Sequence, residues 1–326
     1  MSTVLVTGGT GLIGANICLQ LREIGHDVRA LVRPGSDYQP LLELGVQPQV
    51  GDITSPEDVL QAVDGAEYII HSAAVLGGAS QDPGEHERVN TGGIANVLDS
   101  AEKVGVKRTV ALGTTTYFDY VDQPLTEKST LLPQPPTDPY SVSKRAAFVE
   151  LMRRAEEGLD ACVVIPGGTF GPSPVPARAM VPPSYNLRIA LALRGELDQD
   201  IHFPIPWSYA EDVATCAIAA LERGVRGEKY LAFASPEDVT STAEFLNCAL
   251  EIAGRNHRIV DITAAELDRR PELEEQVGLT LASLARRKFP EPYFSSELTR
   301  KQLSYDPLRL DEALRRTVDW IQEVAR

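Results

Sequence analysis

The chain opens on a short apolar run that leads directly into a glycine-rich turn, and this junction constrains the fold more than any other segment. Residues 4–6 are expected to form a buried parallel strand, and residues 12–24 continue with a helical pattern. Between them, Gly8, Gly11 and Gly14 allow a tight turn, a close approach of a pyrophosphate to the backbone, and close packing of helix on strand. The free N–H groups at the start of the helix attract phosphate. The junction therefore predicts a dinucleotide site at the first turn of the chain.

Strand and helix patterns alternate through the first half of the chain. The expected strands are residues 3–7, 27–32, 47–51, 67–72, 107–113 and 161–165. The expected helices are residues 12–24, 38–45, 56–63, 87–104 and 138–157. Such alternation predicts right-handed crossovers and a parallel sheet with helices on both faces, which is an α/β fold.

The character of the sequence changes after Pro166, where prolines crowd the segments 172–183 and 204–206. Helical patterns recur at 184–195, 209–223, 241–254, 264–286 and 309–325, and residues 228–233 form a candidate strand. We therefore expect a dinucleotide-binding domain over residues 1–165, to which some later segments return. Residues 166–326 are expected to form mainly a smaller, substrate-binding lobe that is interleaved with the first domain.

The composition, with 43% hydrophobic and 24% charged residues, is that of an ordinary globular protein. A net charge of −15 argues against nucleic acid and anionic membranes as main partners. No stretch reaches the roughly 18 apolar residues that a membrane-spanning helix needs. The first apolar run is interrupted by glycine at residue 8, unlike a signal peptide, so we expect a cytoplasmic protein. The 4 cysteines and 5 histidines lack ligand spacing, which predicts no metal site.

The residue that follows the second expected strand indicates which dinucleotide binds. The adenosine ribose should lie there, and enzymes that use NAD usually place an acid at this point to hold the 2′-hydroxyl. This chain places Arg33 there, and a guanidinium can pair with a 2′-phosphate that an acid would repel. The nearest acid, Asp37, lies beyond Pro34 and Gly35. The sequence therefore favours NADP(H), with NAD(H) as the alternative if Arg33 is only a solvated residue at a strand end.

Two further strand ends carry residues suited to a cofactor. Asp52 closes the third strand, where it can accept a hydrogen bond from an adenine amino group or cap the helix that begins near Ser55. These two interpretations stay open. Small residues at 72–74 end the fourth strand, which leaves room for a cofactor to cross the sheet edge or simply allows tight packing.

A tyrosine and a lysine at the start of the expected helix 138–157 form the candidate catalytic pair. Tyr140 and Lys144 are four residues apart and share one helical face. A nearby ammonium favours the phenolate, so we expect Lys144 to lower the pKa of Tyr140 and make it a usable acid or base. Residues 114–116 deliver hydroxyl groups to the carboxyl end of the preceding strand, where open parallel sheets bind ligands.

These motifs stand in the order and spacing of the extended short-chain dehydrogenases/reductases, and the sequence resembles this family over nearly its whole length. The motifs are residues 7–14 (Thr-Gly-Gly-Thr-Gly-Leu-Ile-Gly), 52–53, 71–74, 89–92, 114–115, Tyr140-x-x-x-Lys144, 166–172 and 209–214. The resemblance implies a Rossmann-type doubly wound parallel sheet and a nicotinamide dinucleotide cofactor. Within the family, the sequence is most similar to the carbonyl reductase branch of the dihydroflavonol reductases, which uses NADPH.

The resemblance also implies site residues. The catalytic residues would be Thr114, Tyr140 and Lys144, with Thr115 as the fallback because Gly113 replaces the first serine of the family pattern. Asn90 matches a family asparagine that would support the site. The implied cofactor-binding residues are Thr7, Gly8, Thr10, Gly11, Leu12, Ile13, Gly14, Arg33, Asp52, Ile53, Ser72, Ala73, Ala74, Lys144, Pro166 and Gly167.

Three classes of function compete on this fold: a carbonyl reductase or alcohol dehydrogenase, a nucleotide-sugar epimerase or dehydratase, and a non-catalytic NADP-sensing protein. The candidate acid Tyr140 argues against a sensor, which needs no acid. Two departures argue against nucleotide sugars, because Ile165 and Ile205 stand where such members tend to carry arginine. Arg188 and Arg194 are near enough in sequence to compensate.

An apolar or aromatic ketone or aldehyde, or the corresponding alcohol, is therefore the expected small-molecule substrate. The pocket is expected to use segments 75–79, 115–118, 167–170 and 201–207, in which the candidate substrate residues are Val75, Thr115, Phe118, Phe170 and Trp207. Each aromatic residue could instead belong to the core of the lobe. Family members often dimerise through the helices at 87–104 and 138–157, so a homodimer is expected.

Overall fold

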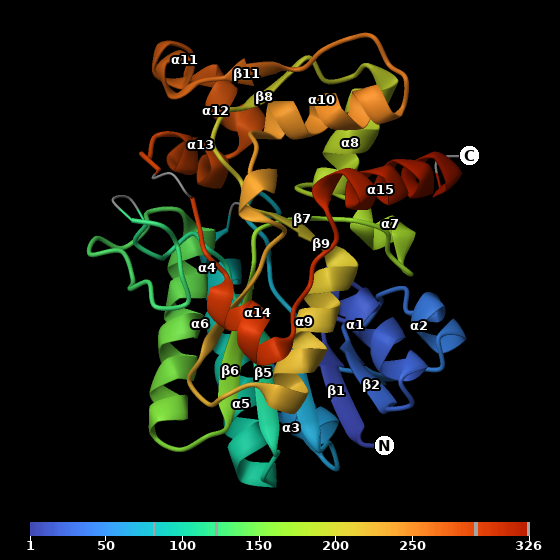
Figure 1. Ribbon diagram of the computed structural model, residues 1–326. Coiled ribbons are helices and arrows are strands. Elements are labelled where there is room, and N and C mark those ends of the chain that lie inside the picture. The colour runs from blue at the N-terminus through green and yellow to red at the C-terminus, as the bar shows by residue number, and fades with distance from the viewer. Residues whose placement is uncertain (81, 121–122, 290–292, 325–326) are drawn as a thin grey trace.

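The computed structural model describes residues 1–80, 82–120, 123–289 and 293–324 (Figure 1). Its centre is a sheet of seven parallel strands in the order β10-β6-β5-β4-β1-β2-β3. The strands are β1 (Thr3–Thr7), β2 (Asp27–Val32), β3 (Gln47–Val50), β4 (Tyr68–His71), β5 (Arg108–Leu112), β6 (Ala161–Pro166) and β10 (Lys229–Ala232). The strand order reverses between β1 and β4, which opens a crevice at their carboxyl ends. The predicted α/β fold with a doubly wound parallel sheet is confirmed.

Both faces of the sheet are covered by helices. Side chains alternate along each strand, so Val4 and Val6 of β1 lie on one face and Leu5 lies on the other. The first face is covered by α1 (Leu12–Glu23), α2 (Gln39–Glu43) and α9 (Ala210–Arg223). The opposite face is covered by α3 (Pro56–Val63), α5 (Gly93–Val104) and α6 (Pro139–Glu156).

Segments from the second half of the chain complete the sheet domain. Val213 of α9, Tyr230 of β10 and Leu303 of α14 (Glu297–Leu303) are buried in the same core as Val4. Helices α1 and α9 lie against each other, although about 190 residues separate them in the sequence. The first half of the chain therefore does not form this domain alone.

The rest of the second half forms a lobe that lies over the carboxyl ends of the strands (Figure 1). Its small sheets are β7 (Gly168–Phe170) with β9 (Trp207–Tyr209), and β8 (Gln199–Ile201) with β11 (Val260–Ile262). Its helices are α7 (Pro176–Ala179), α8 (Tyr185–Arg194), α10 (Thr242–Ile252), α11 (Ala264–Arg269), α12 (Glu272–Val277), α13 (Leu279–Ala285) and α15 (Leu310–Val324). The lobe has its own core, in which Trp207 stacks on Phe245 with ring centroids 3.7 Å apart.

Two of the expected helices are wrong in detail. Residues 83–104 form α4 (Pro83–His86), a π-helix (Glu87–Gly92) and α5, not one α-helix over 87–104. The expected helix 264–286 is divided into α11, α12 and α13, because Pro271 and Gly278 stand at their boundaries and Gly278 has a φ of +88°. The expected helix 309–325 corresponds to α15, and residue 325 lies outside the described residues. Across the described ranges, no helix combines the length and apolarity needed to cross a bilayer.

Candidate active site at the carboxyl edge of the sheet

The turn between β1 and α1 can only be built from glycine at two positions. Gly8 has a φ of +73°, and a Cβ atom there would lie 2.7 Å from the backbone nitrogen of Ala73 at the end of β4. A Cβ atom on Gly14 would lie 2.1 Å from the carbonyl oxygen of Gly8. Gly11 closes the turn by donating its N–H to the same oxygen at 2.9 Å. The turn therefore holds the start of α1 directly against the end of β1.

This turn leaves the start of α1 free to bind an anion. Gly11 is the N-cap residue and provides no side-chain hydrogen bond to the first N–H groups of the helix. The neighbouring residues Thr10, Leu12 and Ile13 are half-buried. Residues 8, 9 and 11 are glycines, so no side chain covers the backbone there. The unpaired N–H groups and the positive end of the helix dipole suit the pyrophosphate of a dinucleotide.

The ends of β1 and β4 are joined beneath this cradle. Thr7 is fully buried, and its hydroxyl lies 2.8 Å from Nδ1 of His71 and accepts the N–H of Ala73 at 3.3 Å. Burial and the charge of Lys144 lower the pKa of His71 to about 3, so this imidazole is neutral. The Thr7 side chain therefore fixes the two strand ends, while Ser72, Ala73 and Ala74 remain half-buried at the edge.

The residues expected around the adenosine lie at the ends of β2 and β3. Arg33 is exposed immediately after β2. The carboxylate of Asp37 accepts the N–H of Gln39 at 3.0 Å, so it is engaged at the start of α2. Asp52 uses Oδ1 to accept the N–H and the hydroxyl of Thr54, both at 2.8 Å.

The capping alternative for Asp52 is resolved by the same hydrogen bonds. The N-cap of α3 is Ser55, whose hydroxyl accepts the N–H of Asp58 at 3.2 Å. Asp52 forms the turn before that cap, so it does not cap the helix itself. Ile53 is buried, and its carbonyl accepts the side-chain amide of Asn96 at 2.9 Å, which ties the end of β3 to α5.

Helix α6 brings the candidate catalytic residues to the end of β5. The helix begins at Pro139, and the N-cap Asp138 accepts the N–H of Ser141 at 2.9 Å. Tyr140 and Lys144 therefore lie in its first turns, over the carboxyl end of β5. The side chain of Thr114, which is 9% exposed, lies close enough to the Tyr140 hydroxyl to lower its pKa. Of the two candidate hydroxyls, the structure brings that of Thr114 to the tyrosine.

The expectation that Lys144 acidifies Tyr140 is wrong for this arrangement. Lys144 is buried, and its Nζ donates a hydrogen bond to the carbonyl oxygen of Leu112 on β5 at 2.7 Å. Burial raises the pKa of Tyr140 to about 12, the Thr114 hydrogen bond lowers it, and the charge of Asp138 raises it further. Burial also lowers the pKa of Lys144 to about 8. Lys144 and Tyr140 share a helical face, but the amine of Lys144 bonds to the sheet and does not determine the pKa of the Tyr140 phenol.

The departure from the family pattern at Gly113 has a steric cause. A Cβ atom on Gly113 would lie 2.9 Å from the hydroxyl oxygen of Tyr117 and 2.9 Å from a methyl carbon of Val163. Tyr117 is fully buried, and its hydroxyl accepts the N–H of Thr114 at 3.4 Å. Tyr117 thus fills the space of a side chain at residue 113 and supports Thr114. Sequence analysis missed this residue, because an aromatic residue in a loop carries no signal for such packing.

Behind the catalytic pair lies a small cavity of about 20 Å³, which is enough for one water molecule. Its polar lining includes Lys144, His71 and Asn90.

Most of the candidate substrate residues lie in packed cores. Phe118, Phe170 and Trp207 are each 1% exposed, and Phe118 packs against Tyr117 and Phe148. Their burial favours core packing over the pocket interpretation, because a fully covered ring offers no surface to a substrate. Val75 and Thr115 are half-buried and remain available.

The segment that follows β6 approaches the lobe closely. A Cβ atom on Gly167 would lie 1.8 Å from the carbonyl oxygen of Pro206, and the N–H of Gly167 is donated to the Ser208 hydroxyl at 2.9 Å. Pro166 is buried at the end of β6. These contacts fix residues 166–167 at the junction between the sheet and the lobe.

The two arginines that could hold a diphosphate are already paired. Arg188 forms a buried ion pair with Asp200, and Arg194 pairs with Glu196 at 2.7 Å. Ile205, which occupies the position where nucleotide-sugar enzymes of the family tend to carry arginine, is 2% exposed. The Arg188 pair is largely buried, whereas the Arg194 pair is exposed on both sides.

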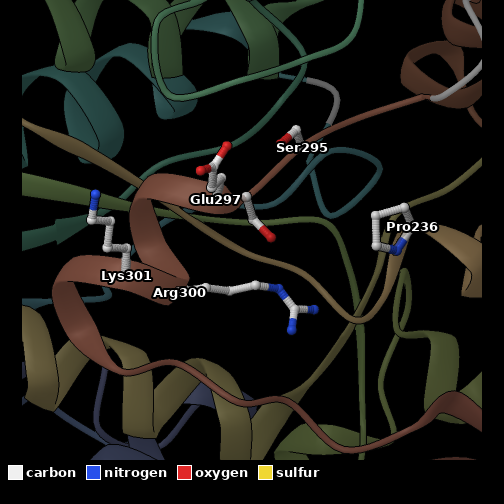
Figure 2. Close-up of a pocket in the computed structure, with 6 residues that line it drawn as sticks. Pro236, Ser295, Glu297, Arg300 and Lys301 are labelled. Carbon is white, nitrogen blue, oxygen red and sulfur yellow. The ribbon is translucent and has the colours of Figure 1, made fainter.

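A surface depression of about 560 Å³ lies elsewhere, beside α14 (Figure 2). It is lined by Pro236, Ser295, Ser296, Glu297, Arg300 and Lys301, and Figure 2 shows Arg300 extending toward Pro236. None of the glycine-turn or α6 residues takes part in this lining, so the depression is separate from the candidate active site.

Comparison with known proteins gives a consistent set of similarities. Residues 4–233 match the family model described as the NAD dependent epimerase/dehydratase family. The chain is similar to sterol demethylase protein B of Methylococcus capsulatus, with 26% identity over 98% of each chain. It is similar to the 3-beta-hydroxysteroid dehydrogenase of Mycolicibacterium neoaurum, with 34% identity over 52% of this chain and 48% of that protein. A Synechocystis protein provisionally named dihydroflavonol 4-reductase is 31% identical over 69% of this chain and 66% of its own.

Solved structures share the fold. The crystal structure of gox2253 has a TM-score of 0.84 at 25% identity and covers 100% of this chain and 99% of its own. The UDP-glucose 4-epimerase of Thermotoga maritima, solved with UDP-glucose, has a TM-score of 0.81 at 20% identity and covers 99% of this chain and 100% of its own.

Proposed function

The chain belongs to the NAD dependent epimerase/dehydratase family, the extended short-chain dehydrogenases/reductases, and we propose that it is an NADP(H)-dependent oxidoreductase. Its reaction interconverts a ketone or aldehyde and the corresponding alcohol on a largely apolar substrate. The family assignment agrees with the resemblance found in the sequence, and members of the family use a nicotinamide dinucleotide. The preference for NADP, the reaction direction and the substrate class are our proposals.

The observation that carries the proposal is the placement of Tyr140, in the first turn of α6, beside Thr114 at the carboxyl end of β5. A bound nicotinamide dinucleotide supplies the hydride donor or acceptor. In reduction, the Tyr140 hydroxyl donates its proton to the substrate oxygen as the carbonyl carbon gains the hydride. Thr114 donates a hydrogen bond to the same oxygen and holds it beside the phenol. Burial raises the pKa of Tyr140 to about 12, so the phenol is protonated at neutral pH and holds the proton that reduction requires.

A fused-ring, sterol-like substrate is favoured over a nucleotide sugar. Arg188 is held by Asp200 in a largely buried ion pair, so a diphosphate would have to break that pair to gain this guanidinium. The relatives named sterol demethylase protein B and 3-beta-hydroxysteroid dehydrogenase carry sterol substrates in their names. A hydroxyl or ketone on an apolar ring system fits both observations.

The proposal is tested by the oxidation of NADPH in the presence of a mixed panel of carbonyl compounds. The panel holds 3-ketosteroids, aromatic ketones and aliphatic aldehydes, with UDP-glucose as the nucleotide-sugar control. We expect turnover of at least one ketone and none of UDP-glucose. Tight NADPH binding without turnover of any carbonyl or alcohol would instead favour the sensing protein, and epimerisation of UDP-glucose would favour the sugar enzyme.

Replacing Arg33 with alanine should weaken NADPH binding by about 10–100-fold and leave NADH binding nearly unchanged. The reason is that a charge-assisted pair with the 2′-phosphate contributes about 1.5–3 kcal/mol, whereas NADH has no such phosphate. The measurement is the Kd of each cofactor from quenching of intrinsic fluorescence. Arg178→Ala removes another exposed arginine, on α7, and is the matched control. Equal loss for both cofactors would contradict a role at the 2′-phosphate.

The initial rate of reduction should be constant at low pH and decline as the pH rises through about 8. This prediction rests on the expected role of Lys144 in binding the cofactor. Burial lowers the pKa of Lys144 to about 8, so its ammonium is charged below that pH and is lost above it. The measurement is kcat/KM for NADPH oxidation from pH 6 to 10. Lys144→Arg keeps the charge throughout this range and should remove the decline. A decline that persists in this variant would belong to another group.

A homodimer through α5 and α6 is a second proposal about this chain. Val142 and Val149 of α6 are 45% and 46% exposed and stand seven residues apart, on one side of the helix. We expect Val149→Asp to shift a dimer toward monomer in sedimentation velocity at low micromolar concentration. A wild-type protein that sediments as a monomer at high concentration would end this proposal.

A further inference from the structure

A π-helix stands directly beside the catalytic helix. It spans Glu87–Gly92, follows α4 and contacts α6 over several residues. π-helical segments are rare in proteins, and those that occur often lie at functional sites. His86, directly before the π-helix, and Asn90, within it, are each 2% exposed, and both contact α6.

Asn90 fixes the backbone around the catalytic tyrosine. Its Oδ1 accepts the N–H of Val75 at 2.8 Å, and its Nδ2 donates to the carbonyl oxygen of Val75 at 3.0 Å and to the Ser143 hydroxyl at 2.9 Å. The Ser143 hydroxyl in turn donates to the carbonyl oxygen of Tyr140 at 2.8 Å. Asn90 therefore joins the start of the loop over residues 75–80 to the backbone of Tyr140.

His86 makes the corresponding contact with the ring of Tyr140. The two ring centroids are 6.3 Å apart and the ring planes are inclined at 68°, an edge-to-face arrangement. Nε2 of His86 lies 3.2 Å from the carbonyl oxygen of Ser80. Because a carbonyl only accepts, Nε2 carries the proton, and this bond ties the ring to the far end of the same loop.

The second nitrogen of His86 makes it unlike an ordinary core residue. Nδ1 is buried and has no hydrogen-bond partner within the described part of the chain. A buried acceptor without a partner lowers stability, so packing alone would favour a fully apolar ring at this position. The imidazole instead combines a ring contact with Tyr140 and a directed hydrogen bond that sets the plane of the ring.

We propose that His86 is a positioning residue for Tyr140. Asn90 holds the backbone of the tyrosine, and His86 holds its ring, so that the phenol hydroxyl stays beside Thr114. Asn90 is hydrogen-bonded to Val75 at the start of the loop over residues 75–80. His86 is hydrogen-bonded to Ser80 at its end, and this bond keeps His86 in place. This inference rests on the proposed role of Tyr140 as the proton donor.

Three variants of His86 separate the ring contact from the hydrogen bond. His86→Phe keeps an aromatic ring, His86→Gln keeps an N–H for Ser80, and His86→Ala keeps neither. We expect Ala and Gln to lower kcat by about 10–100-fold, since a displacement near 1 Å can cost about 100-fold, with the KM for NADPH changed by less than about twofold. Phe should retain kcat within about threefold. The assay is NADPH oxidation with whichever carbonyl the panel identifies.

His26 supplies the matched control. Its Nδ1 is also buried without a partner within the described residues, but it lies in the turn between α1 and β2. His26→Ala should leave kcat and KM unchanged. A wild-type kcat in His86→Ala would overturn the proposal. So would a wild-type kcat in His86→Gln together with a lowered kcat in His86→Phe, because the hydrogen bond and not the ring contact would then matter. A loss of NADPH affinity and thermal stability shared by all three His86 variants would assign His86 to the fold alone and would also overturn it.

A readout without turnover separates this proposal from the proposed function. Protein labelled with 3-fluorotyrosine gives a ¹⁹F resonance for Tyr140, which is assigned by its disappearance in Tyr140→Phe. The ring current of His86 should shift this resonance, so His86→Ala should move it and His86→Phe should move it less. If the wild type reduces no carbonyl, the proposed function fails while this shift still tests the contact. An unchanged Tyr140 resonance in His86→Ala overturns the positioning role.

Discussion

Tyr140→Phe should lower kcat by about 100–10,000-fold, the range that a positioned general acid contributes, and change the Kd for NADPH by less than about twofold. The substitution removes one oxygen atom and keeps the ring that packs edge-to-face on His86. Thr114 loses its partner, and the substrate oxygen loses its proton donor. Because the phosphate site is proposed at the glycine turn and not at this oxygen, cofactor binding should persist. The measurement pairs steady-state NADPH oxidation with direct titration of the cofactor.

The control for this substitution is a tyrosine hydroxyl that is buried elsewhere. Tyr230 on β10 accepts the N–H of Val225 at 2.8 Å and donates to Gln302 at 3.0 Å. Tyr230→Phe should reduce thermal stability, as expected when a buried hydrogen bond is lost, and should leave kcat unchanged. If Tyr140→Phe turns over at the wild-type rate, or if Tyr230→Phe loses as much activity, the acid assigned here is the wrong residue.

Gly14→Ala should weaken NADPH binding by about 10–100-fold, which corresponds to the ~1–3 kcal/mol that overpacking costs. The added methyl carbon would lie 2.1 Å from the carbonyl oxygen of Gly8, and neither backbone can move without opening the turn. The start of α1 would then withdraw from the phosphate. The midpoint of thermal unfolding should fall as well, because the same contact packs α1 on β1.

The matched control is a helical glycine with room beside it. A Cβ atom on Gly92 would lie 3.8 Å from the carbonyl oxygen of Glu87, which is ordinary van der Waals contact. Gly92→Ala should bind NADPH like the wild type. Gly11→Ala, with a nearest approach of 3.3 Å, should fall between the two. Normal binding by folded Gly14→Ala would remove the glycine turn from the cofactor site.

The sequence predicted the sheet and the elements that carry the candidate site residues, because both follow from local patterns. The strand before Gly8, the helix after Gly14 and the tyrosine four residues before Lys144 are read from spacing alone, and the structure has each in the expected element. Parallel strands carry their ends to one edge, so Thr114 and Tyr140 could be expected to meet.

What the sequence could not predict depends on packing. Phe118, Phe170 and Trp207 occupy positions that suit a pocket or a core equally well, and only the folded chain shows that they are buried. The raised pKa of Tyr140 follows from burial and from an amine that bonds to Leu112, neither of which is set by helical spacing. The π-helix at Glu87–Gly92 leaves no mark in the periodicity of its residues.

The return of α9 to the sheet has a consequence for how the protein is made. The face of β1 that carries Val4 and Val6 is shared by α1 and α9, and α9 ends at Arg223. A ribosome must therefore translate the chain through Arg223 before the nucleotide-binding half has the helix that covers it. Until then α1 has an uncovered apolar side, and the two lobes cannot mature one after the other.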